Sequence, residues 1–402
     1  MNRDRWYKKD VTLTWSTRHT SFAVAQELFS SHDVDSGSRL LLRSLDLTAL
    51  PEQGHALDFG SGYGVLGLGW RDAMRQWTVD LVDRDALAVA FSQWNAARLG
   101  FANGSVTSRV GLGPDGGPEL GCNLILWNVP GKAGEPVLRE LTRDVARALA
   151  DGGLAALVVV NPLAPVTRDA LREDERVSIV LDEEHADHTV IHARRAGSGS
   201  QPSDPFERGV FDRELGQFGV DEFEYDIIPV VGLPEYDTYS FATQVVFDAL
   251  RTVEGEVGTI LVMRPGQGHV SLVAANQFRP ERLTMIDRDY LALKTSVRAL
   301  VDVGLGLPAI EIVASPDLID VPGDEPHALA ILMLEDQVRN ELHVARLDDL
   351  AHMMEEGGSL VVGGTSSVVS RFLSFAAKAE GWKLRDRVKR SGASAARLER
   401  LA

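Results

Sequence analysis

The fold is decided by residues 56–67, which read Ala56-Leu57-Asp58-Phe59-Gly60-Ser61-Gly62-Tyr63-Gly64-Val65-Leu66-Gly67. A short apolar run leads into one acid, glycines then recur at alternate positions, and apolar residues resume. This pattern predicts a strand, a tight loop and the first turn of a helix. Glycine lets a ligand approach the backbone closely, and the first amides of a helix lack intrahelical partners. Backbone donors beside one fixed carboxylate suit a zwitterionic or nucleoside ligand better than a bare phosphate.

From residue 55 onward the apolar pattern alternates between strand-like and helix-like segments. Such alternation predicts βαβ units and a mainly parallel sheet with helices on both faces. The last two predicted strands lie close together in the chain, which is compatible with an antiparallel edge. Strands are predicted at 55–59, 78–83, 105–110, 123–127, 154–160, 176–181 and 188–194, and helices at 64–76, 85–99, 135–150 and 164–174. Upstream, the spacing predicts a strand at 11–15 and helices at 22–29 and 39–50.

The length of 402 residues predicts two or three domains. The single cysteine, Cys122, excludes an internal disulfide, and no apolar run approaches the ~20 residues that span a bilayer. The N-terminus lacks the apolar segment of a signal peptide. We therefore expect a cytoplasmic protein without membrane association. No metal site is expected, because the acidic and histidine-containing segment 183–188 is better interpreted as a solvated turn.

The formal net charge of -17 argues against a chain that coats nucleic acid by bulk electrostatics. Two local clusters of basic residues could still form a binding patch or could be solvated terminal charge. The first cluster is Arg3, Arg5, Lys8 and Lys9, and the second is Lys383, Arg385, Arg387, Lys389 and Arg390.

The second half of the chain repeats the first at an offset of about 204 residues. Residues 82–88 recur as 286–292, and the glycines at 62 and 64 recur at 266 and 268. Together with a Gly/Pro/Ser-rich segment, these matches predict a tandem duplication with a domain at 1–196, a linker at 197–205 and a domain at 206–402. The second copy lacks key residues, because Val262 replaces Asp58 and Arg264 replaces Gly60. We therefore expect the first copy to keep its cofactor motifs and the second to be degenerate.

Two cofactors are compatible with the first glycine loop. Gly62-x-Gly64-x-x-Gly67 matches the dinucleotide fingerprint, with Asp83 at the expected distance. The alternative is the acid-plus-glycine loop of S-adenosylmethionine-dependent methyltransferases, in which Asp83 would bind the ribose hydroxyls. Asp58 favours the alternative, because a carboxylate repels a pyrophosphate and attracts an ammonium group.

The chain resembles the tandem "methyltransferase small domain" family of ribosomal RNA guanine-N2 methyltransferases. The resemblance rests on residues 27–42, on the segment 57–66 with Asp83, and on Asn128-Val129-Pro130-Gly131 after the fourth predicted strand. It implies two tandem Rossmann-like class I methyltransferase domains, each with a mainly parallel seven-stranded sheet. It also implies S-adenosyl-L-methionine as cofactor and ribosomal RNA or a ribosomal subunit as partner. The cofactor-binding residues would be Asp58, Phe59, Gly60, Gly62, Gly64, Asp83 and Arg84.

The same resemblance implies that Asn128 orients an exocyclic guanine amine towards the methyl group, while Pro130 holds the shape of its loop. The family has Asn-Pro-Pro followed by an aromatic residue, whereas Val129 and Gly131 stand at two of these positions here. Trp127 or Tyr63 could supply the missing base stacking, and a base in structured RNA would be extruded into the pocket. Two alternatives remain: a non-catalytic tandem protein that binds cofactor or RNA, and a nicotinamide-dependent oxidoreductase.

Overall fold

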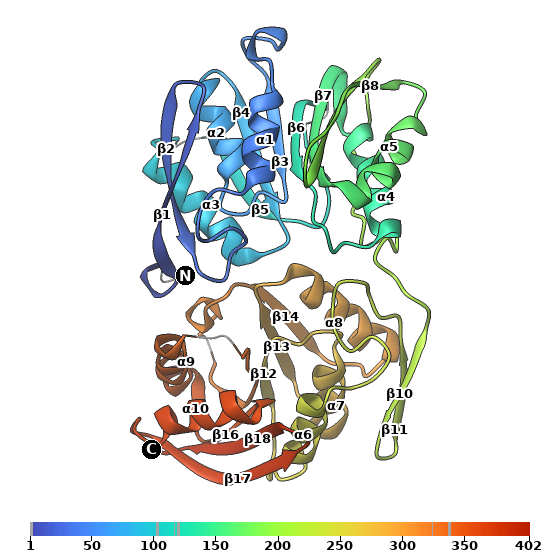
Figure 1. Cartoon of the computed structure of the whole chain (residues 1–402). Helices are drawn as coiled ribbons and strands as arrows, with labels where there is room; N and C mark the ends of the chain where they lie inside the picture. The colour runs from blue at the N-terminus through green and yellow to red at the C-terminus, as the bar shows by residue number, and fades with distance from the viewer. Residues whose placement is uncertain (1–2, 102–103, 116, 119–120, 324, 337–338) are drawn as a thin grey trace. The chain divides into compact units, whose positions relative to one another are not determined.

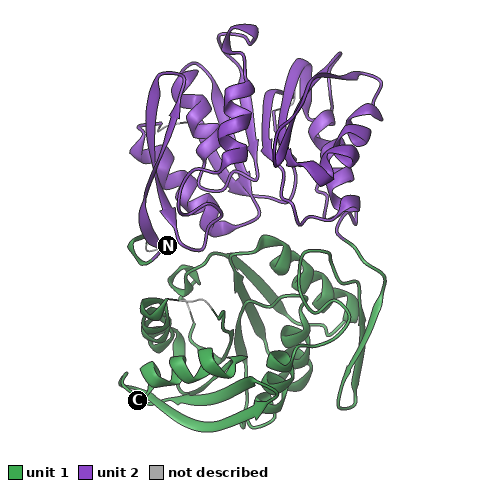
Figure 2. Cartoon of the chain, in the orientation of Figure 1, with its two compact units in different colours: residues 1–5, 212–402 green, residues 6–211 purple. Residues whose placement is uncertain are grey.

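The computed structural model describes residues 3–101, 104–115, 117–118, 121–323, 325–336 and 339–402. The chain forms two compact units (Figure 2). The N-terminal unit, purple in Figure 2, comprises Trp6–Phe211. The C-terminal unit, green, comprises Asp212–Ala402 together with the short 3-10 helix η1 (Arg3–Arg5). Segment 197–205 packs on the N-terminal unit, where the Ser200 amide donates to the Arg147 carbonyl oxygen over 2.9 Å.

A seven-stranded sheet forms the centre of the N-terminal unit, in the order β5-β4-β3-β6-β7-β9-β8 (Figure 1). All neighbouring pairs are parallel except those made by β9, which runs antiparallel to both β7 and β8. The predicted antiparallel edge is therefore confirmed. The strands are β3 (His55–Phe59), β4 (Thr78–Asp83), β5 (Val106–Val110), β6 (Cys122–Asn128), β7 (Leu149–Val160), β8 (Val177–Glu184) and β9 (His188–Arg195).

The C-terminal unit repeats this sheet strand for strand, in the order β14-β13-β12-β15-β16-β18-β17. Its strands are β12 (Thr259–Met263), β13 (Arg282–Asp287), β14 (Ala309–Ala314), β15 (His327–Met333), β16 (Met354–Thr365), β17 (Trp382–Arg390) and β18 (Ala393–Arg400). The predicted duplication of one mainly parallel α/β fold is confirmed, because both copies share the same strand order and the same antiparallel edge.

Helices cover both faces of each sheet. In the N-terminal unit α1, α2 and α3 pack along one face, and α4 packs against α5 on the other. The C-terminal unit repeats this with α6, α7 and α8 on one face and α9 and α10 on the other. The helices are α1 (Ser36–Ser44), α2 (Val65–Ala73), α3 (Ala86–Arg98), α4 (Glu135–Arg147), α5 (Ala164–Arg172), α6 (Phe241–Leu250), α7 (His269–Phe278), α8 (Tyr290–Val303), α9 (Asn340–Met353) and α10 (Ser366–Ala376). Further 3-10 turns are η2 (Leu47–Ala49), η3 (Asn161–Leu163) and η4 (Leu318–Asp320).

The predicted helix at 22–29 is wrong, because residues 22–25 belong to the hairpin of β1 (Tyr7–Trp15) and β2 (Arg18–Ala25) and residues 26–29 form turns after it. Ser16 and Thr17 both have positive φ, as a two-residue hairpin turn requires. Residues 22–25 are all buried, so β2 shows no alternation and its short apolar run resembles a buried helix. A second hairpin, β10 (Gly216–Val220) with β11 (Phe223–Ile227), occupies the start of the C-terminal unit.

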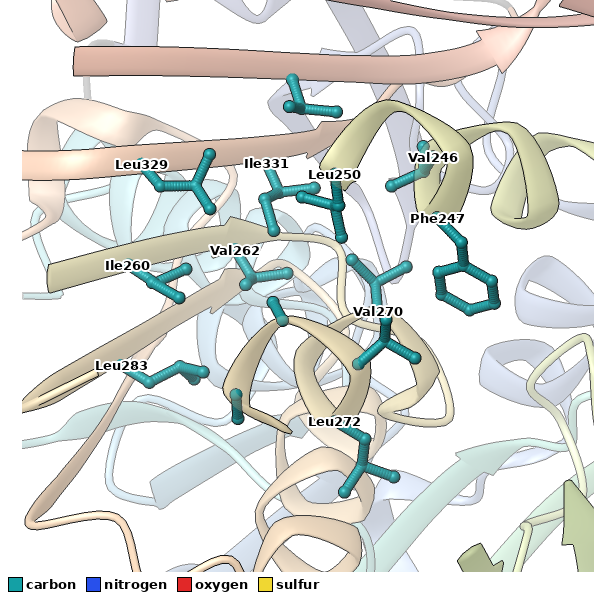
Figure 3. Packing of buried hydrophobic residues seen from close by; sticks show 14 of the residues in the cluster. Val246, Phe247, Leu250, Ile260, Val262, Val270, Leu272, Leu283, Leu329 and Ile331 are labelled. Atoms are coloured by element: carbon teal, nitrogen blue, oxygen red, sulfur yellow. The ribbon is translucent and has the colours of Figure 1, made fainter. Parts of the chain in front are cut away.

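The core of the C-terminal unit includes the position that corresponds to Asp58. Val262 points into a cluster of aliphatic side chains that contains Val270 and Ile331 (Figure 3). A valine is compatible with this apolar surrounding, whereas an unpaired carboxylate would be costly there. Among the described residues, no helix is both long enough and apolar enough to span a membrane.

Close approach of α2 to the sheet depends on Gly67. A Cβ at this position would lie 2.4 Å from Leu81 Cδ2 and 2.9 Å from Asp58 Cβ. We expect Gly67→Ala to lower the free energy of unfolding by about 1–3 kcal/mol, because the helix must move away from β3 and β4. Urea unfolding measures this effect. The control is Gly258→Ala, whose Cβ meets no atom within 4 Å, so its effect should stay within about 0.5 kcal/mol. Equal losses in the two variants would contradict the close-packing argument.

Candidate functional site

The candidate site lies at the carboxyl ends of three adjacent strands. In the order β4-β3-β6 all pairs are parallel, so Asp83, Phe59 and Asn128 end their strands at one edge of the sheet. The chain runs from β3 outward to β4 and β5 and then returns to β6, which makes the gap between β3 and β6 a topological switch point. Open α/β sheets bind ligands at such a point.

The glycine loop after β3 is fixed by hydrogen bonds to β4. The amides of Gly60 and Ser61 donate to the Val82 carbonyl oxygen, over 2.8 and 3.1 Å. The Gly62 amide donates to Asp83 Oδ2 over 2.8 Å. Gly62 has a φ of 55°, and a Cβ there would meet no atom within 4 Å. The loop therefore exposes backbone in front of open space.

Buried Asn95 of α3 supports this loop from behind. Its amide nitrogen donates to the carbonyl oxygens of Ala23 and Tyr63, each over 3.0 Å, and its Oδ1 accepts from the Ala23 amide. The β1–β2 hairpin is thus attached to the glycine loop through one side chain. Gly64 begins α2 in the left-handed region, with a φ of 90°.

Asp83 is the last residue of β4 and Arg84 follows it, and both are half-buried. Asp83 Oδ1 accepts the Asp85 amide over 2.9 Å, and its Oδ2 accepts the Gly62 amide. These two bonds position the carboxylate beside the glycine loop. The assignment of ribose binding to Asp83 remains a prediction.

Asp58 is fully buried beneath the first turn of α2. Its Oδ2 accepts the Gly67 amide over 2.7 Å, and its Oδ1 has no hydrogen-bond partner among the described residues. Burial raises the pKa of Asp58 to about 7, the Gly67 hydrogen bond opposes this, and the charge of Asp83 adds to it. The structure thus holds an unsatisfied carboxylate oxygen beneath the glycine loop, where a cationic ligand would stabilise the ionised carboxylate.

Asn128 is held by two residues that the sequence did not connect to it. Its Nδ2 donates to Asp35 Oδ2 over 2.9 Å and to Ser38 Oγ over 3.0 Å. Asp35 also caps α1 by accepting the Ser38 amide. Because a carboxylate must face the NH₂ side of the amide, this network fixes the orientation of Asn128 and leaves Oδ1 as an acceptor. The contact spans 93 residues, so no local pattern could have revealed it.

The contacts of Val129, Pro130 and Gly131 show how the chain accommodates its departures from the family motif. The Val129 amide, which a proline would lack, donates to the Val158 carbonyl oxygen over 2.9 Å and extends the pairing of β6 with β7. Pro130 is exposed, and its carbonyl oxygen accepts the Ala133 amide in a turn. A Cβ at Gly131 would meet only Val160, at 3.8 Å, so this position is open.

Neither aromatic residue considered for base stacking is accessible. Trp127 and Tyr63 are 1% and 3% exposed, and Trp127 packs on Phe59 with ring centroids 5.1 Å apart. Phe59 therefore contributes to the core and borders the loop through its backbone. The segment that precedes Asp35 instead carries an aromatic side chain that sequence reasoning missed, since Phe29 is 72% exposed.

The C-terminal unit keeps the backbone of this loop. Arg264 has a φ of 63°, against 69° for Gly60, and its amide donates to the Ile286 carbonyl oxygen over 2.9 Å as Gly60 does to Val82. A left-handed arginine costs about 1–2 kcal/mol, which glycine avoids. The backbone is therefore conserved between the units, and the difference lies in the side chains.

Side chains occupy the loop of the C-terminal unit. Arg264 Nε lies 3.3 Å from Glu335 Oε1, and Arg264 also donates to the Met333 carbonyl oxygen. Burial opposes the ionisation of Glu335, but Arg264 and Arg346 hold its pKa below the usual range. Gln267 exchanges hydrogen bonds with the backbone of Val230. Strand pairing places Met333 at the position of Asn128, so this copy has no amide there.

Comparisons with known proteins identify related sequences. A family model described as "Methyltransferase small domain" matches residues 19–181. The uncharacterized protein YbxB of Bacillus subtilis (strain 168) is 31% identical over 179 residues, which are 43% of this chain and 87% of that protein. "Ribosomal RNA small subunit methyltransferase C" of Ectopseudomonas mendocina (strain ymp) is 38% identical over 136 residues. That alignment covers 33% of this chain and only 39% of the relative.

One solved structure matches the whole chain in fold. It is the T. thermophilus 16S rRNA N2 G1207 methyltransferase in complex with AdoMet and guanosine, with a TM-score of 0.70 over 100% of both chains. The sequence identity is 14%, so this likeness concerns the tandem fold.

The burial of Asp58 predicts a pH dependence of stability. Its folded pKa of about 7 lies above the ordinary aspartate value of 3.8, so the folded state binds the extra proton between these values and stability falls as pH rises from about 4 to 7. Asp58→Asn keeps an oxygen for the Gly67 amide and removes the charge. We expect its Tm without ligand to exceed the wild-type Tm at pH 8 by at least about 2 °C.

Thermal scans of both proteins from pH 5 to pH 8 measure this difference, which should shrink towards pH 5. The control Asp151→Asn changes an exposed acid of the same unit. A wild-type advantage at pH 8 would contradict the prediction.

Proposed function

This chain belongs to the methyltransferase small domain family of S-adenosylmethionine-dependent methyltransferases, and we propose that its N-terminal unit methylates an exocyclic guanine amine in ribosomal RNA. The family match at 19–181 falls entirely within that unit. The proposed substrate is supported by relatives named as ribosomal RNA methyltransferases. Membership of this family also disfavours the nicotinamide alternative.

The residues at the switch point fit the family's cofactor. The unpartnered Oδ1 of Asp58 provides a buried negative group for an ammonium ion, and Gly62 presents open backbone beside it. Asp83 ends the neighbouring strand, and its carboxylate oxygens are acceptors of the kind that ribose hydroxyl groups require. We propose that these residues, with Phe59, Gly60, Gly64 and Arg84, hold S-adenosyl-L-methionine. When bound, this cofactor supplies an electrophilic methyl group.

The proposal that an amine is methylated rests on the orientation of Asn128. Both hydrogens of its Nδ2 are used by Asp35 and Ser38, so Oδ1 is the atom that can accept a hydrogen bond from a substrate. An acceptor fixed in this way would bind one N–H of an exocyclic amine and orient the nitrogen lone pair. Positioning of this kind can supply much of a rate enhancement. No strong base is required, because the amine becomes acidic once it is alkylated.

The C-terminal unit is proposed to be inactive. Its counterpart of Asp58 is Val262, its counterpart of Asn128 is Met333, and Arg264 with Glu335 fills the loop. The duplicated unit therefore offers no equivalent set of donors and acceptors, and one cofactor per chain is expected.

Substitution of Gly60 by the corresponding residue of the C-terminal unit tests the cofactor site. Gly60→Arg introduces the residue that the C-terminal unit carries at the same backbone conformation, and should weaken binding of S-adenosylmethionine at least 100-fold by occupying the loop. Gly60→Ala is the matched control for left-handed strain. Its Cβ would meet only Trp127, at 3.9 Å, so its affinity should stay within about threefold. Isothermal titration calorimetry measures affinity and stoichiometry, and two sites per chain or unchanged binding by Gly60→Arg would refute the assignment.

Substitution of Asn128 tests its orienting role. Asn128→Ala should reduce kcat by about 100-fold or more while leaving the cofactor affinity unchanged, because it removes the fixed acceptor. Ser38→Ala keeps Asn128 and removes one of its two anchors, so a smaller loss of about tenfold is expected. The assay is transfer of labelled methyl groups into ribosomal subunits that lack their native modifications. Equal activity of Asn128→Ala and wild type would exclude this role, and no transfer by the wild type would exclude the proposed substrate.

A further inference from the structure

The end of the C-terminal unit has a charge opposite to that of the whole protein. Residues 366–400, from α10 to β18, contain nine basic and three acidic side chains, whereas the chain carries a net charge of -17. Five of the basic residues belong to β17, which forms the outer edge of its sheet (Figure 1). A local concentration of cations in an acidic protein requires a physical explanation.

The basic side chains of β17 emerge on both sides of the strand. Strand pairing sets Lys389 opposite Ser394 and Arg390 opposite Ala393. Lys389 and Arg390 are successive residues, so their side chains lie on opposite faces of the sheet. Lys383 precedes a bulge at Arg385. Because successive residues alternate between faces, the positive charge follows the whole free edge of β17.

Most of this charge is not neutralised by the protein. Arg385 pairs with Glu399 at 2.5 Å, but Arg387 donates to two neutral hydroxyl groups, those of Ser370 and Ser394. The three remaining basic residues of the strand are exposed and form no ion pair among the described residues; they are Lys383, Lys389 and Arg390. Lys383 lies opposite Glu399 and helps to lower the pKa of that carboxyl, so its charge is partly compensated, whereas Lys389 and Arg390 lie opposite the uncharged Ser394 and Ala393.

The duplicated unit provides an internal comparison. The equivalent elements from α5 to β9 contain five basic and eight acidic residues, and the equivalent edge strand β8 ends with Asp182, Glu183 and Glu184. Charged side chains protect a sheet edge from pairing with other chains. Charge of either sign provides such protection, as β8 demonstrates, so protection leaves the positive sign of β17 unexplained.

The N-terminal basic cluster does not offer a comparable surface. Arg5 pairs with Asp349 at 2.7 Å, Lys8 donates to Ser31 Oγ, and Lys9 donates to the His32 carbonyl oxygen. Arg5 is thus neutralised by an ion pair, and Lys8 and Lys9 are only half-exposed and hold neutral groups of the chain, whereas Lys383, Lys389 and Arg390 are exposed. Of the two clusters singled out in the sequence, the C-terminal one is available to a partner.

We propose that the basic edge, defined as the exposed cations Lys383, Lys389 and Arg390 of β17, binds the phosphate backbone of the RNA substrate. This inference rests on the proposed function and assigns substrate binding to the unit that lacks the catalytic residues. Cations spaced along an extended strand match the repeated charge of a polynucleotide, and each phosphate contact releases counterions. The contact is independent of sequence and adds affinity, while base choice stays with the N-terminal unit.

A triple variant of the full chain tests the basic edge. Lys383→Gln, Lys389→Gln and Arg390→Gln together should weaken binding to a ribosomal RNA fragment at least tenfold. The slope of log K against log salt should fall in magnitude by about 2, because three phosphate contacts are lost. In the transfer assay KM should rise with little change in kcat. Fluorescence anisotropy measures the RNA affinity, and calorimetry should show unchanged affinity for S-adenosylmethionine.

Two further variants serve as controls. The charge-preserving variant Lys383→Arg, Lys389→Arg and Arg390→Lys should restore both affinity and salt slope. Arg172→Gln removes an exposed cation from α5, the counterpart of α10, and should leave the slope unchanged. If the wild-type protein methylates RNA and the triple variant has an unchanged KM and salt slope, the proposal for the basic edge is overturned and the proposed function stands. A wild-type protein that neither binds nor methylates ribosomal RNA would overturn the proposed function as well.

Discussion

The structure of the site depends on the burial of the Asp58 carboxylate beneath the first turn of α2. Gly67 allows the helix to approach the sheet, and its amide holds one oxygen of this carboxylate at 2.7 Å. The other oxygen is left without a partner among the described residues. Unsatisfied buried acceptors are costly, so the fold retains here a group that a cationic ligand can satisfy. The positions of Gly62 and Asp83 follow, because both lie on the loop and strand beside it.

The two units separate the contribution of the backbone from that of the side chains. The loops after β3 and β12 share their positive φ values and their hydrogen bond to the neighbouring strand. Only the first loop combines this backbone with a buried acid, open glycines and an oriented amide. Fold alone does not determine function, and this chain shows the distinction within one molecule. In the second copy, the ion pair of Arg264 with Glu335 lies beside the loop, where the first copy has the open glycines.

Much of the fold could be predicted because its signals are local. The alternation of strand and helix and the glycine loop lie within short windows, and the repeat lies at a constant offset. The contact of Asn128 with Asp35 joins segments 93 residues apart, so only the folded chain brings them together. Burial of Trp127 and Tyr63 could not be inferred either, since an aromatic residue beside a glycine loop suits both a core and a stacking role. The prediction of a helix at 22–29 was wrong because the last four residues of β2, 22–25, are all buried and show no alternation.

The acidic net charge no longer conflicts with an RNA substrate once charge is considered locally. At physiological ionic strength electrostatic interactions between exposed groups are screened within about 8 Å. A phosphate beside β17 therefore responds mainly to the charges of this edge, which are the five basic residues of β17 with Asp386 and the neighbouring Glu399, and only weakly to acids elsewhere on the chain. The negative remainder would repel RNA from surfaces that have no role in binding. Net charge sets the average behaviour of the protein, whereas recognition depends on the sign of the charge at one strand edge.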